Sequence, residues 1–204
     1  MRKISIALAC VAGLLAQPLV AQEKKVTEET VAKPAMTLEE RKRVDARLLD
    51  NLLARLYAST SERQAKAIEA TILQLWLRNY SPSVEVLMKQ AINALNDDEH
   101  SSALTLLDTV LEIAPDYAEA WNKRATVHYF TQDYERALAD IDQVLELEPR
   151  HFGALSGRAL VHRAMGNKKA ALQAFRQALE IHPFMKGAKS AIKALKKEVE
   201  GERI

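Results

Sequence analysis

The stretch RATVH, Arg124 to His128, returns 34 residues later as RALVH, Arg158 to His162. Three prolines share this interval, and each follows an apolar segment that ends in Leu-Glu-Ile or Leu-Glu-Leu; they are Pro115, Pro149 and Pro183. Self-similarity at a fixed interval of this length is typical of a solenoid, in which each repeat is one supersecondary unit. The sequence therefore predicts an all-α solenoid of helix-turn-helix repeats.

Residues 84–183 resemble three tetratricopeptide repeats, whose pattern is Trp-x2-Leu-Gly-x2-Tyr, then Ala-x3-Phe, then Pro. The second repeat shows it in the residues Trp121, Ala125, His128, Ala137, Ile141 and Pro149. The third shows it in the residues Leu155, Ala159, His162, Ala171, Phe175 and Pro183. The first is the loosest and shows it in the residues Leu87, Ala91, Ala94, Ala103, Leu107 and Pro115. The resemblance implies repeats over 84–117, 118–151 and 152–185, stacked in a right-handed superhelix.

Small residues at two positions of each repeat let its two helices approach closely, and larger apolar residues fill the space between them. No single hairpin buries its own apolar face, so neighbouring repeats must stack. We interpret twelve residues as packing residues of the repeats: Trp121, Arg124, Ala125, His128, Ala137, Asp140, Pro149, Arg158, Ala159, Ala171, Phe175 and Pro183.

Arg124 and His128 lie four residues apart beside Trp121, an arrangement that suggests catalysis at first sight. The same two residue types recur in RALVH, at Arg158 and His162. This recurrence argues against catalysis, because residues that recur in successive repeats usually serve the packing of each repeat. We expect Arg124 to form an ion pair with Asp140, which stands level with it across the hairpin. Arg158 faces Ala174 instead, so its candidate partners are Asp140 and Asp142 of the preceding repeat. An unpaired, exposed Arg158 would be the better ligand candidate.

The ligand surface that the resemblance implies is a concave groove lined by the first helix of each repeat. Its tentative partner-binding residues are Lys89, Asn122, Lys123, Thr126, Tyr129, Phe130 and Arg163. The mixture of aromatic, amide and cationic groups suits an extended peptide or a partner helix, with Tyr129 and Phe130 as anchors. Ordinary solvated side chains are the alternative interpretation of the same residues.

One variant of this repeat family holds the acidic C-terminus of chaperones with a set of Lys, Asn and Arg side chains. The matching positions here are occupied by Met88, Ile92, Lys123, Gly153 and Gly157. Four of the five lack the required polar group, so the acidic ligand is not carried over to this chain.

The sequence outside the three repeats predicts four further segments. Residues 1–21 have two basic residues, an apolar run and small residues near Ala21, as in a secretory signal peptide, and lipid attachment at Cys10 is the less favoured alternative. Residues 22–36 have the composition of a disordered linker. Capping boxes and Leu-rich spacing predict a helical hairpin over 37–80, expected to cap the first repeat. Residues 186–204 predict a capping helix and tail at the other end.

The charge balance and the absence of catalytic motifs exclude several classes of function. Without residues 1–21 the chain has 27 basic and 27 acidic residues, which does not favour nucleic-acid binding. No phosphate loop, metal-ligand spacing or nucleophile elbow occurs, so we expect no enzyme, cofactor or metal. The prediction is a secreted, periplasmic adaptor of the bacterial cell envelope without a membrane segment in the mature chain. The alternative is a structural protein that self-associates through the Leu-rich hairpin.

Overall fold

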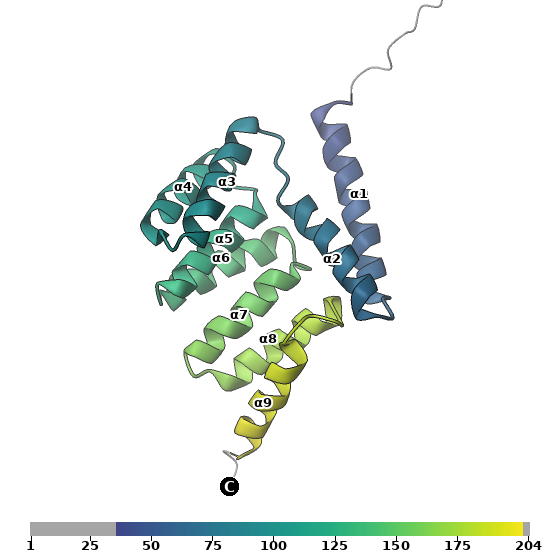
Figure 1. The fold of residues 1–204 in the computed structure, drawn as a ribbon, viewed down its shortest axis with the longest axis vertical. Coiled ribbons are helices and arrows are strands. Elements are labelled where there is room, and N and C mark those ends of the chain that lie inside the picture. The colour runs from purple at the N-terminus through teal and green to yellow at the C-terminus, as the bar shows by residue number, and fades with distance from the viewer. Residues whose placement is uncertain (1–35, 202–204) are drawn as a thin grey trace, which may run out of the picture. The chain divides into compact units, whose positions relative to one another are not determined.

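The computed structural model describes residues 36–201, which form helices and no strand (Figure 1). The helices are α1 Leu38–Tyr57, α2 Glu62–Trp76, α3 Pro82–Asn96, α4 His100–Ile113, α5 Ala118–Phe130, α6 Tyr134–Leu147, α7 Phe152–Ala164, α8 Lys168–Ile181 and α9 Ala188–Gly201. The all-α fold class is thereby confirmed. The predicted signal peptide, Cys10, residues 22–35 of the predicted linker and the last three residues of the tail lie outside the described range.

Three helical hairpins, α3–α4, α5–α6 and α7–α8, stack one after another along the chain (Figure 1). The alanines predicted to permit close approach are buried, with Ala103, Ala137 and Ala171 fully inaccessible to solvent. Phe175 and Ile141 fill the spaces between the helices and are 4% and 2% exposed. The helix α9 packs on α8 through Ala188 and Leu195, so it covers the end of the third repeat.

The turn inside each hairpin contains one residue with a left-handed backbone. These residues are Asp98, Gln132 and Gly166, with φ of 61°, 62° and 78°, and they too are spaced at 34 residues. Glycine adopts this conformation without a Cβ clash, whereas Asp and Gln do not. Asp133, which follows Gln132 in the α5–α6 turn, is the N-cap of α6 and accepts a hydrogen bond from the Arg136 amide.

The expected start of α1 is present, because Thr37 and Glu40 form the complete capping box. The second box is incomplete. Ser61 accepts the Gln64 amide, but the Gln64 side chain returns to the amide of Thr60 rather than to that of Ser61. Both helices nevertheless begin where a side-chain oxygen takes up an otherwise unsatisfied amide.

The α1–α2 hairpin does not cap the first repeat, and that prediction was wrong. Its apolar residues Leu52, Leu56, Ile72 and Trp76 form a core with Phe152 at the start of α7. Ile181, Phe184 and Met185, at the end of α8 and just after it, pack against the same core. The docking surface is thus formed by aromatic and aliphatic side chains at and after the ends of the second and third repeats.

The predicted apolar stripe of α1 is only partly buried. Its second half is buried, whereas Val44 and Leu48 are 49% and 42% exposed. The wide Leu-rich stripe on which hairpin self-association rested is thus largely covered by the chain itself at Leu52, Leu53 and Leu56. No helix among residues 36–201 is long and apolar enough to cross a membrane.

Candidate functional site

Arg124 is fully engaged in ion pairs. Its Nε and Nη2 donate to the two oxygens of Asp140 at 2.9 and 2.8 Å, and Nη1 donates to Asp108 at 2.7 Å. The guanidinium carbon also lies 4.7 Å from the centre of the Trp121 ring. The hydrogen bonds to Asp140 raise the pKa of Arg124 further above its ordinary value. The expected Arg124–Asp140 pair is confirmed, and with Asp108 it engages all three side-chain nitrogens of Arg124.

Arg158 makes a contact equivalent to that of Arg124 with Asp108. Its Nη2 pairs with Asp142, which precedes it by 16 residues, as Asp108 precedes Arg124. Asp142 is therefore the partner, and Asp140 is already taken by Arg124. Each arginine ties the first helix of its own repeat to the second helix of the preceding one. This recurring pair explains why RATVH and RALVH share an arginine.

The two histidines of these motifs are also packing residues. His128 is 6% exposed, and its Nε2 lies 3.8 Å from Asp140. Burial lowers the pKa of His128 despite that carboxylate, and burial together with Arg158 lowers the pKa of His162. Both rings thus favour the neutral form more than a solvated histidine does.

An apolar cavity of about 140 Å³ lies between α5 and α7. It brings together four of the predicted groove residues, Asn122, Thr126, Tyr129 and Phe130. The remaining lining residues come from α5, α6 and α7: Ala125, Ile141, Gly153, Gly157, Leu160 and Val161. The lining is thus mainly aliphatic and aromatic, with Asn122 and Thr126 as its polar side chains, and this is the composition typical of a ligand pocket.

Two glycines of α7 keep this cavity open. A Cβ at Gly157 would lie 3.6 Å from Cδ1 of Ile141, and a Cβ at Gly153 would lie 3.2 Å from Cε1 of His151. Any longer side chain at either position would extend into the space between the helices. The sequence identified these glycines only as missing clamp residues, and it gave no sign that their absence of side chains creates a cavity.

The predicted groove cation Lys123 is neutralised within the protein. Its Nζ lies 2.8 Å from Glu119, which is 3% exposed and also accepts hydrogen bonds from Asn122 and His151. Burial opposes ionisation of Glu119, but the His151 hydrogen bond and the Lys123 charge outweigh it and lower its pKa. The Nδ1 atom of His151 accepts the Ala154 amide at 3.0 Å, so Nε2 carries the proton that is donated to Glu119.

The α1–α2 hairpin covers one side of this cluster. The Trp76 ring stacks on His151 with centroids 3.9 Å apart, and the Tyr117 hydroxyl donates to the carbonyl of Leu77. Lys89 is exposed on α3 beside Leu77, Met88 and Ile92, in a separate recess. Arg163 is exposed and does not line the α5–α7 cavity. The structure therefore joins four predicted groove residues and separates the three cations from the cavity.

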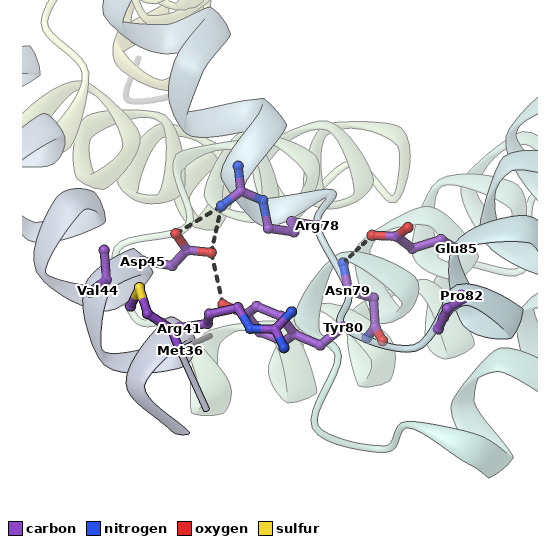
Figure 2. A pocket seen from close by; sticks show the side chains of 9 residues that line it. All are labelled: Met36, Arg41, Val44, Asp45, Arg78, Asn79, Tyr80, Pro82 and Glu85. Carbon is purple, nitrogen blue, oxygen red and sulfur yellow. Dashed lines mark hydrogen bonds and ion pairs between the residues drawn. The ribbon is translucent and has the colours of Figure 1, made fainter. Parts of the chain in front are cut away.

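A larger recess, of about 410 Å³, lies at the start of α1 (Figure 2). In Figure 2 the Asp45 carboxylate faces the Arg78 guanidinium and the Tyr80 hydroxyl. It accepts hydrogen bonds from Arg78 at 2.7 and 2.8 Å and from Tyr80 at 2.8 Å. Burial and the Asp45 hydrogen bond raise the pKa of Tyr80 to about 12. These groups satisfy one another and tie α1 to the segment before α3, which indicates a structural role for the recess.

The comparisons with known proteins agree with this architecture. The tetratricopeptide-repeat family model matches residues 122–186. A TPR repeat-containing protein of Rhizobium etli is 33% identical over 86 residues, which are 42% of each chain. The chain thus matches less than half the length of this curated relative.

Solved structures show the same fold. The Sgt2 TPR domain from Aspergillus fumigatus is 23% identical, with a TM-score of 0.56 over 59% of this chain and 81% of that domain. The first TPR of Spaghetti (RPAP3), bound to the HSP90 peptide SRMEEVD, is 15% identical, with a TM-score of 0.56 over 57% of this chain and 93% of that one. Together with the stacked hairpins and their 34-residue spacing, these matches show that the chain contains tetratricopeptide repeats.

Proposed function

We propose that the protein is a non-enzymatic protein-interaction module that binds a peptide or a partner helix in the groove formed by α3, α5 and α7. The α5–α7 cavity carries the proposal, because it places Tyr129 and Phe130 beside an apolar space of about 140 Å³. A dry cavity of about 150 Å³ holds a benzene-sized group. The anchor we propose is therefore one bulky aliphatic or aromatic side chain of the partner.

The structures of related fold support the binding of a peptide, but the residues of this chain do not fit the same type of peptide. The Spaghetti domain is bound to an acidic HSP90 peptide. In this chain the positions that match the acidic clamp hold Met88, Ile92, Gly153 and Gly157, and Lys123 is already paired with Glu119. We therefore propose that the partner binds through an apolar side chain and not through a carboxylate, since the cavity lining contains no Lys or Arg.

Filling the cavity tests the proposal. Panning a random peptide library on the purified protein should select sequences with Leu, Ile, Phe or Trp at one fixed position. Gly157→Leu should weaken the selected peptides at least about tenfold, because it occupies the space of a buried anchor. Ala164→Leu, at the exposed C-terminal end of the same helix and outside the cavity lining, is the matched control and should bind as the wild type does. Selection of peptides that bind Gly157→Leu equally well would contradict the groove assignment.

We propose further that the protein acts in the bacterial cell envelope. The support is the order of basic, apolar and small residues over 1–21. Fractionation of the source cells, with N-terminal sequencing of the mature chain, tests this location. A periplasmic chain that begins near Gln22 is expected, and a cytoplasmic chain that begins at Met1 would contradict it.

A further inference from the structure

Charge is segregated along the stack of repeats. The first two repeats, residues 84–151, contain 14 acidic and five basic residues, whereas residues 152–201 contain three acidic and ten basic ones. Residues 36–201 as a whole contain 23 of each sign. The described chain therefore combines an acidic end and a basic end in a body without net charge.

The acidic end has an uncovered helix face. Val86, Gln90, Asn93 and Asp97 recur at spacings of four, three and four along α3 and its C-cap, and all four are exposed. Val86 is 57% exposed, whereas Ala120, at the same position of the next repeat, is fully buried against its neighbour. The face of α3 remains open because the α1–α2 hairpin docks near α7 and α8 instead.

Acidic side chains surround this face. Exposed carboxylates at the start of α3, in the α3–α4 turn and at the end of α4 are Glu85, Asp98, Glu99 and Glu112. With Asp97 on the face itself, they give this end of the solenoid a negative potential. Stacking by a further apolar repeat is disfavoured here, because Asn93 replaces the buried Val127 and Val161 of the later repeats.

The basic end is formed by α9 and the adjoining side of α8. The helix α9 buries Ala188 and Leu195 against α8, which directs its lysines away from the core. The exposed cations are Arg176, Lys186, Lys189, Lys193, Lys196 and Lys197. They have the opposite sign to the α3 end and lie at the other end of the stack.

We propose that the basic α9 end of one copy docks on the acidic α3 end of a second copy. Opposite potentials at the two ends favour this contact, and a body without net charge adds little repulsion between copies. Because the two surfaces differ, the contact is heterologous and can extend into an open chain of copies. This contact does not use the α5–α7 cavity, so it is independent of the observation on which the groove proposal rests.

Sedimentation velocity of the purified protein across concentration tests this contact. At an ionic strength of about 0.1 M the weight-average mass should rise with concentration, and at about 1 M the protein should become monomeric, since the Debye length falls from about 10 Å to about 3 Å. A strict monomer at low salt would overturn the proposal.

Neutralising each end separately identifies the surfaces. Lys193→Gln with Lys196→Gln and Lys197→Gln removes three of the six cations of the basic end, and Glu85→Gln with Asp97→Asn and Glu99→Gln removes three of the five carboxylates of the acidic end. Each triple variant alone should associate at least about tenfold more weakly. An equimolar mixture of the two should form a dimer and grow no further, because each copy retains one intact end. Association of either variant at wild-type strength would contradict the assignment.

Two controls complete the experiment. Arg43→Gln with Arg47→Gln and Lys66→Gln removes the same charge from the exposed side of the α1–α2 hairpin and should leave association unchanged. Flotation with phosphatidylglycerol vesicles separates self-association from lipid binding. A protein that is monomeric in solution and binds these vesicles only through the α9 lysines would overturn the proposal and show that this end faces a membrane instead.

Discussion

Arg124 and Arg158 occupy the same position of successive repeats, but their surroundings differ. The carboxylate of Asp140 that pairs with Arg124 is 5% exposed, whereas that of Asp142, paired with Arg158, is 67% exposed. Removing one partner of a buried ion pair leaves an unpaired buried charge, and removing a partner of an exposed pair leaves a solvated one. The two motifs therefore differ in what their arginines contribute to stability.

Arg124→Met should lower the free energy of unfolding by about 3 kcal/mol, because Asp140 would remain buried without its partner. Arg158→Met is the matched control, and it should cost less than about 1 kcal/mol. Adding Asp140→Asn to Arg124→Met should recover part of the loss. Urea denaturation monitored by circular dichroism measures all three. Equal losses for the two arginine variants would show that burial of the carboxylate does not set the difference between them.

The cavity shows the limit of prediction at this scale. The family resemblance implied a groove that includes Asn122, Thr126, Tyr129 and Phe130, and the structure brings these four residues to one cavity. The role of Gly153 and Gly157 could not be predicted, because it depends on the distance between α5 and α7. The engagement of Lys123 by Glu119 was also missed, although the spacing of four residues was visible in the sequence.

At the scale of the helical elements, each repeat turn depends on one residue with positive φ. Gly166 meets this requirement without strain, while Gln132 holds a Cβ in a region that side chains disfavour. The three turns share their backbone geometry because the helix lengths and the 34-residue interval are nearly constant. Their sequences differ, so the strain is distributed unevenly among the repeats.

Gln132→Gly should raise the free energy of unfolding by up to about 1 kcal/mol, because it removes the Cβ clash at a φ of 62°. Gly166→Gln should lower it by a similar amount at the equivalent turn. Thermal and urea unfolding of both variants provide the measurement. A loss of stability in Gln132→Gly would indicate that the Gln132 side chain makes a favourable contact that outweighs the strain.

At the scale of the whole molecule, the sequence predicted the stack of repeats but not the position of the α1–α2 hairpin. A repeat interval determines which hairpins are neighbours, since each repeat contacts the next in the chain. The hairpin lies outside that interval, and its docking is decided by Trp76, Phe152 and Phe184, which are distant in sequence. Its apolar pattern shows that it needs a partner surface but not which one.

We propose above all that the α5–α7 cavity accepts an apolar side chain of a partner peptide. The most direct measurement is ¹H–¹⁵N chemical-shift mapping of the protein with a peptide selected on it. We predict that the largest shifts fall on the cavity residues, including Thr126, Tyr129 and Gly157, and that they disappear in Gly157→Leu but persist in Ala164→Leu. Shifts centred on the recess around Asp45, or shifts unchanged in Gly157→Leu, would contradict the claim.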